Sequence, residues 1–164
     1  MQANWAGELG GTGAEGRGGG GPEERLTGWG VVGRPSGWYS GRMVEKGRPI
    51  LVVSPRWQTR ALFAAELGER LGRDVVSAPD VEGALGLIKM GRVDPAAVVV
   101  DAEPGIGPAD VERLLEAIQD VPVVLVVGPM RKRAFEGLRG RVAVWMVRPV
   151  TVGSVVRAVE AVVA

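Results

Sequence analysis

Residues 96–101 read AAVVVD and residues 121–129 read VPVVLVVGP. Both stretches contain an unbroken, valine-rich apolar run, without the alternation of apolar and polar residues that marks a half-exposed strand. Such runs are typical of central strands that helices cover on both faces of a parallel sheet. The two stretches therefore predict the middle of a parallel β-sheet.

Three further apolar runs predict the other strands of this sheet, over residues 50–53, 74–77 and 142–147. The run over residues 74–77 is the least apolar, which favours a position at the edge of the sheet. We expect the five strands to lie over residues 50–53, 74–77, 96–100, 123–127 and 142–147.

The segments between these runs have apolar residues at helical spacing. Gly72 is expected to end the first helix, Asp80 to cap the second and Pro108 to begin the third. The fourth helix, over residues 130–139, is short and weakly amphipathic, and Thr151 caps the fifth. Strands and helices that alternate in this way predict an α/β fold with a doubly wound, five-stranded parallel sheet.

The composition excludes several classes of function. The chain of 164 residues has no cysteine and no histidine, so it lacks disulfides, thiolate metal ligands and the commonest general base. Its formal net charge of +1 gives no reason to expect binding to nucleic acid or to a membrane surface. No apolar run is long enough to span a bilayer, and the N-terminus does not resemble a signal peptide, so a cytoplasmic protein is expected.

The composition also divides the chain into two parts. Of the 26 glycines, 15 precede Pro49, and few large aliphatic residues accompany them. We expect residues 1–47 to be a disordered, glycine-rich leader and residues 48–164 to be the folded domain. The tryptophans of the leader could contact a partner or have no specific role. Alternatively, residues 1–42 are an artefact of the gene model, and the protein begins at Met43.

The order and length of the elements from Pro49 to Ala164 resemble the receiver domain of two-component signalling. The residues that carry this resemblance are Asp101 at the end of AAVVVD, the run VPVVLVVGP, and VWMVRPVT over residues 144–151. The resemblance implies a flavodoxin-like sheet with strand order 2-1-3-4-5. It also implies a cis peptide bond between Arg148 and Pro149, where the family has Lys-Pro.

In that family, the aspartate after the third strand accepts a phosphoryl group from a kinase histidine. Mg²⁺, held by paired acids after the first strand, neutralises the negative charge of the phosphoryl oxygens. A hydroxyl after the fourth strand and a lysine after the fifth hold those oxygens.

Most of these groups are replaced in this chain. The positions of the acidic pair hold Ser54 and Pro55, and the position of the hydroxyl holds Val127. Asp101 remains as a residual phosphoacceptor position, with Arg148 as its cationic partner in place of lysine. The resemblance therefore implies a degenerate receiver with no metal site and no cofactor, and Mg²⁺ would bind only if the protein still accepted a phosphoryl group.

Several residues have two interpretations. Asp101 is either a residual phosphoacceptor or a polar residue that ends a buried strand and pairs with Arg148, and Glu103 is the nearby acid that could partly replace the missing pair. Trp145 corresponds to the family's switch aromatic but could simply pack in the core. The basic stretch over residues 131–141 is either a solvated face or a partner interface.

Three functions follow from these observations. The first is a stand-alone, degenerate receiver that acts in a phosphorelay by contact with a kinase, a regulator or an output protein, with a homodimer through the fourth and fifth helices as a further option. The second is a functional phosphoacceptor that uses Asp101. The third, a small cofactor-binding enzyme domain, is opposed by SPRWQTR after the first strand, where a dinucleotide site needs glycines. We expect a protein that is not an enzyme.

Overall fold

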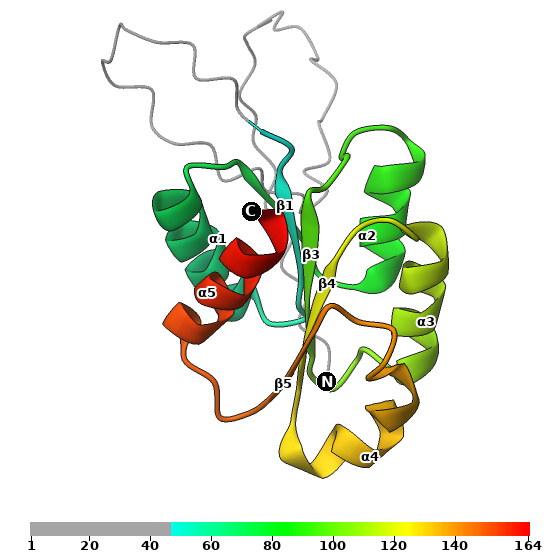
Figure 1. Cartoon of the computed structure of the whole chain (residues 1–164). Coiled ribbons are helices and arrows are strands. Elements are labelled where there is room, and N and C mark those ends of the chain that lie inside the picture. Colours follow the sequence, from blue (N-terminus) through cyan, green and yellow to red (C-terminus); the bar gives the residue numbers. More distant parts are fainter. Residues whose placement is uncertain (1–46) are drawn as a thin grey trace, which may run out of the picture.

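The computed structural model of the chain describes residues 47–164 (Figure 1). The leader predicted for residues 1–47 lies outside the described residues, apart from Gly47. Strands and helices alternate along the described part of the chain, as the sequence predicted.

The five strands form one parallel sheet with the order β2-β1-β3-β4-β5, which confirms the predicted topology. Its strands are β1 (Ile50–Val53), β2 (Val75–Ala78), β3 (Ala97–Ala102), β4 (Val123–Val127) and β5 (Val144–Val147). Every residue of β1, β3 and β4 is buried, whereas most residues of the edge strands β2 and β5 are only partly buried. The valine-rich runs are thus the centre of the sheet.

The helices follow the strands and cover both faces of the sheet. They are α1 (Trp57–Leu71), α2 (Val81–Lys89), α3 (Pro108–Ala117), α4 (Lys132–Phe135) and α5 (Val152–Val163), with the 3-10 turns η1 (Pro129–Arg131) and η2 (Glu136–Leu138) on either side of α4. The predicted end signals hold. Gly72 ends α1 with φ 63°, and the side chains of Asp80 and Thr151 accept hydrogen bonds at the starts of α2 and α5.

Two apolar layers form the core, one on each face of the sheet. The helices that cover them, α1 and α5 on one side and α2 and α3 on the other, are seen in Figure 1. Ile50 and Val52 of β1 point toward α1 and α5, while Leu51 and Val53 point toward α2 and α3, because successive strand residues face opposite sides. On α5, Val155 is fully buried in the layer that also contains Ile50 and Val52. The apolar stripe of α5 is therefore used within the domain.

The predicted fourth helix and the bounds of three strands need correction, and the smallest change is in β2, which lies one residue later than predicted. β3 extends two residues further than predicted, because its pairing with β4 continues to Ala102 opposite Val127, so Asp101 lies within the strand rather than after it. β5 begins two residues later than predicted, because its pairing with β4 begins at Val144. The predicted fourth helix is instead η1, α4 and η2 in succession, consistent with the low helix propensity of Gly137 and the frequency of 3-10 turns at helix ends.

None of the helices within residues 47–164 is long and apolar enough to cross a membrane.

Candidate functional site

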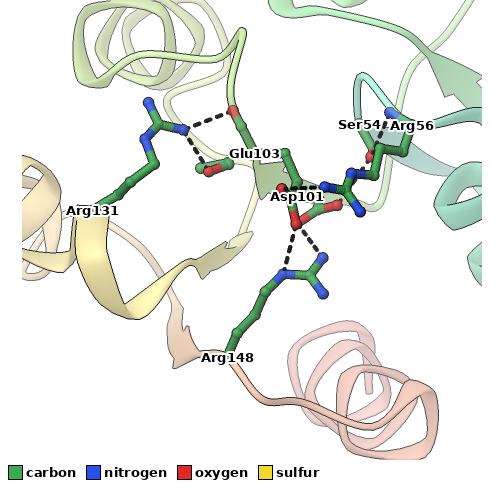
Figure 2. Close-up of polar contacts among 7 residues, drawn as sticks. Ser54, Arg56, Asp101, Glu103, Arg131 and Arg148 are labelled. Atoms are coloured by element: carbon green, nitrogen blue, oxygen red, sulfur yellow. Dashed lines mark hydrogen bonds and ion pairs between the residues drawn. The ribbon is translucent and has the colours of Figure 1, made fainter.

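The residues singled out by the sequence meet at the carboxyl ends of the parallel strands (Figure 2). Ser54 directly follows β1, Asp101 is the fifth residue of β3, and Arg148 directly follows β5. Crevices at this edge of an open α/β sheet are where such folds bind ligands. The edge is therefore the candidate site.

Both carboxylate oxygens of Asp101 have partners. The hydroxyl of Ser54 donates to Oδ2 across 3.0 Å, and the guanidinium of Arg148 donates from Nη2 to Oδ1 across 2.6 Å. The side chain of Asp101 is fully buried, while that of Arg148 is 31% exposed. A charged group can stay buried when it is paired and hydrogen-bonded in this way. Asp101 is thus enclosed by its own neighbours.

Glu103 extends this pair into a larger network (Figure 2). Its Oε1 lies 3.1 Å from Nε of Arg148, and its Oε2 lies 3.4 Å from a terminal nitrogen of Arg56. Arg148 therefore contacts two carboxylates at once, and Glu103 contacts two guanidinium groups. The charges alternate along the series Arg56, Glu103, Arg148 and Asp101.

Two more arginines bind main-chain carbonyl groups at the same edge. Arg60 donates to the carbonyl of Ser54 across 2.6 Å. Arg131 donates from Nη1 to the carbonyls of Ala102 and Glu103, both across 2.7 Å, and from Nη2 to that of Ile106 across 2.8 Å. Its guanidinium also lies 5.1 Å from the centre of the Phe135 ring.

Arg131 thereby joins η1 to the loop after β3. One planar guanidinium with several donors can satisfy three carbonyls, which a lysine ammonium cannot do with the same geometry.

The balance of charge at this edge is unfavourable for a cation. The carboxylates of Asp101 and Glu103 are already paired with the guanidinium groups of Arg56 and Arg148. Two further guanidinium groups, those of Arg60 and Arg131, bind main-chain carbonyls at the same edge. Within residues 47–164, no three acidic, histidine or cysteine side chains gather where they could hold a metal ion. Mg²⁺ requires oxygen ligands with negative charge, so the residues present do not fit it.

The switch positions of the resemblance are also altered. Val127, at the position of the family's hydroxyl, is a fully buried apolar residue at the end of β4. Trp145 is partly buried against the core, and its indole Nε1 is buried without a hydrogen-bond partner. The peptide bond between Arg148 and Pro149 is cis, as the resemblance implied.

The structure brings together Ser54, Asp101 and Arg148, which the sequence had singled out. Pro55 lies beside Ser54 and is only partly buried, and it offers no polar side-chain group. Sequence reasoning missed the contributions of Arg56, Arg60 and Arg131, and it considered Glu103 only as a replacement acid. The position of Arg56 and Glu103 just after β1 and β3 was a usable signal, because parallel strands end at one edge.

Comparison with known proteins identifies the fold. No protein-family model matches the chain, and no curated protein matches its sequence. The receiver domain of Francisella response regulator 1452 is 19% identical, with a TM-score of 0.60 over 71% of this chain and 97% of that one. The receiver domain of NtrX from Brucella abortus is 22% identical, with a TM-score of 0.59 over 70% and 97% of the two chains.

A similar structure with a different description is adenylate cyclase from Rhodopirellula baltica. It is 17% identical, with a TM-score of 0.62 over 71% of this chain and 87% of that one. Receiver domains nevertheless recur among the similar structures. The chain therefore has the fold of response-regulator receiver domains.

Proposed function

We propose that this protein is a receiver-like module of a signal-transduction pathway, which acts by contact with another signalling protein and does not depend on phosphorylation. The observation that carries the proposal is the state of Asp101. Its carboxylate is fully buried, and both of its oxygens are held, by Ser54 on one side and by Arg148 on the other.

Phosphoryl transfer to Asp101 would require changes that this site opposes. The attacking oxygen would have to leave a partly buried ion pair with Arg148 or a buried hydrogen bond from Ser54, and either change removes a partner from a buried carboxylate. The incoming phosphoryl group would also need a cation to neutralise its charge, and Ser54 and Pro55 supply no carboxylate to hold one. The guanidinium of Arg148 is already shared between Asp101 and Glu103.

The receiver fold supports a partner from the signalling proteins, such as a kinase, a regulator or an output protein. Fold alone does not fix function, so the proposal rests on the site as well as on the fold. A fixed network at the carboxyl edge would hold the surrounding loops in one conformation. The surface that a partner recognises would then have the same conformation whether or not a phosphate donor is present.

Phosphorylation of the full-length protein tests this proposal directly. The protein is incubated with acetyl phosphate and Mg²⁺, and its intact mass is followed alongside that of an Asp101→Asn variant, which keeps an acceptor for the Ser54 hydroxyl. We expect no added phosphate on either protein. In parallel, beryllofluoride with Mg²⁺ should leave the thermal unfolding temperature unchanged.

A stoichiometric phosphate adduct that is present on the native protein and absent from Asp101→Asn would overturn the proposal. The protein would then be a functional phosphoacceptor that uses Asp101. An active receiver treated in the same experiment shows that the reagents work.

A further inference from the structure

Helix α2 has an apolar stripe on its inner face, and its outer face carries two glycines and two apolar side chains, of which Met90 is the C-cap residue. The inner stripe packs in the core and consists of Val81, Ala84, Leu85 and Ile88. The outer set has the same spacing and consists of Gly83, Gly86, Leu87 and Met90. A surface helix of a globular domain normally has one apolar stripe and a polar opposite face. Helix α2 lies beside α3 (Figure 1), and its outer face departs from this rule.

A shallow hollow of about 620 Å³ lies on this outer face. Gly83, Gly86, Leu87 and Met90 line it, and Met90 is 62% exposed. Its charged lining residues are Asp80 at the N-cap and Glu82 in the first turn of α2, with Arg92 just beyond the end of the helix. The hollow is therefore apolar in the middle and carries opposite charges at its two ends.

Nothing within the domain requires a glycine at position 86. A Cβ atom added there would meet no atom within 4 Å, and the backbone of this residue is helical. A glycine in a helix interior costs about 0.5–1 kcal/mol relative to alanine. This cost has a physical reason if another backbone approaches α2 closely at Gly86.

We propose that the outer face of α2 binds the same face of a second copy of this chain, with the two helices antiparallel across a two-fold axis. An axis that passes between Gly86 and Leu87 places Leu87 of each copy over Gly86 of the other. The same axis places Met90 of each copy over Gly83 of the other. Each large side chain thus faces a residue without a side chain, so the face is complementary to itself.

The charges of the hollow follow the same symmetry. The antiparallel arrangement brings Glu82 of each copy near Arg92 of the other, which gives two pairs of opposite charge. Both residues are exposed, and the contact of Glu82 with Arg113 on α3 is long, at 3.4 Å. These pairs fix the antiparallel direction, because a parallel arrangement would oppose like charges.

Sedimentation velocity of the full-length protein, from micromolar to near-millimolar concentration, tests the proposal. One helix face buries less area than a standard interface, so we expect a weak dimer that forms as concentration rises. Gly86→Gln should lower the association constant by about tenfold to hundredfold, because the new side chain prevents close approach. The fold should tolerate Gly86→Gln, since the position is open.

The matched control is Gly153→Gln on α5, where an added Cβ would make only an ordinary contact with Arg157. This variant should dimerise like the native protein. A dimer that Gly153→Gln disrupts and Gly86→Gln does not would overturn the proposal and favour an interface on α5. A native protein that stays monomeric throughout the range would also overturn it.

Exchange of charges provides a second test. Glu82→Arg and Arg92→Glu should each weaken self-association, because each variant opposes like charges twice. An equimolar mixture of the two variants should associate like the native protein, since the heterodimer regains both opposite pairs. Circular dichroism establishes first that each variant is folded. A mixture that associates no better than its components would refute the antiparallel arrangement.

Discussion

The hydroxyl of Ser54 donates a hydrogen bond to Oδ2 of Asp101 across 3.0 Å, and neither residue is accessible to solvent. This bond links the carboxyl ends of two neighbouring central strands, β1 and β3. Ser54 is therefore a neutral donor at a position where a second carboxylate would need a metal ion to balance its charge. Asp101 is stabilised by the protein itself.

Replacing this donor by an acid should recreate the demand for a cation. We expect Ser54→Asp to lower the free energy of unfolding by about 3–5 kcal/mol, because it places an uncompensated charge beside Asp101 in the interior. Mg²⁺ at millimolar concentration should recover part of this loss. The free energies are measured by urea denaturation with and without Mg²⁺.

Ser54→Ala is the control for this prediction. It should cost about 1–3 kcal/mol, because it leaves Oδ2 of Asp101 without its donor, and Mg²⁺ should not alter that cost. If Mg²⁺ stabilises the native protein as much as Ser54→Asp, the site already binds the metal and the prediction is wrong.

Removal of the Arg148 guanidinium should destabilise the domain strongly. Arg148→Met leaves the buried carboxylate of Asp101 without its counter-charge, and we expect a loss of about 3–5 kcal/mol in the free energy of unfolding. Asp101→Asn combined with Arg148→Met should be less damaging than Arg148→Met alone, since no charge is then left unpaired. A double-mutant cycle by urea denaturation measures the coupling, and strictly additive losses would contradict it.

Arg131 should hold the loop after β3 in place. Arg131→Lys keeps the charge but cannot donate to three carbonyls from one planar group, so amide hydrogen exchange should accelerate over residues 103–107. Mass spectrometry of hydrogen exchange measures this change. The neighbouring Arg133→Lys, at an exposed position, is the control and should leave the loop unaltered. Equal exchange in both variants would show that the three hydrogen bonds do not restrain the loop.

Removing the buried indole nitrogen of Trp145 should have little effect on stability. A buried N–H without an acceptor costs about 1–3 kcal/mol, and Trp145→Phe removes it while keeping an aromatic ring. This gain should offset most of the packing lost with the smaller ring. We therefore expect an unfolding free energy within about 1 kcal/mol of the native value. A loss of about 3 kcal/mol or more, typical of a large cavity, would show that packing dominates.

The sheet could be predicted from the sequence because its central strands are unbroken apolar runs. The runs AAVVV and VVLVV have no polar residues, so a strand with one face exposed to solvent is excluded for them. The intervening helices have clear end signals, such as Gly72 and Asp80. The fourth helix was mispredicted as one segment. Its apolar spacing is weak and it contains Gly137, so tertiary contacts, including those of Arg131, decide its conformation.

The site could be predicted only in part. The family's pattern located Ser54, Asp101 and Arg148, because each of them lies at the carboxyl end of a predicted strand. Arg56, Arg60 and Arg131 have long side chains whose direction depends on what surrounds them, and their sequence positions do not reveal whether they reach solvent or a carbonyl group. The alternation of charges through Glu103 therefore emerged only from the three-dimensional arrangement.

The excess of guanidinium groups at the carboxyl edge has a consequence for the rate at which partners arrive. Arg56, Arg60, Arg131 and Arg148 place four cationic side chains around the ends of β1, β3 and β5, even though the whole chain has a formal charge of only +1. An acidic partner that docks there would be steered during diffusional encounter. Its association rate constant would fall as ionic strength rises, while its dissociation rate constant would change little.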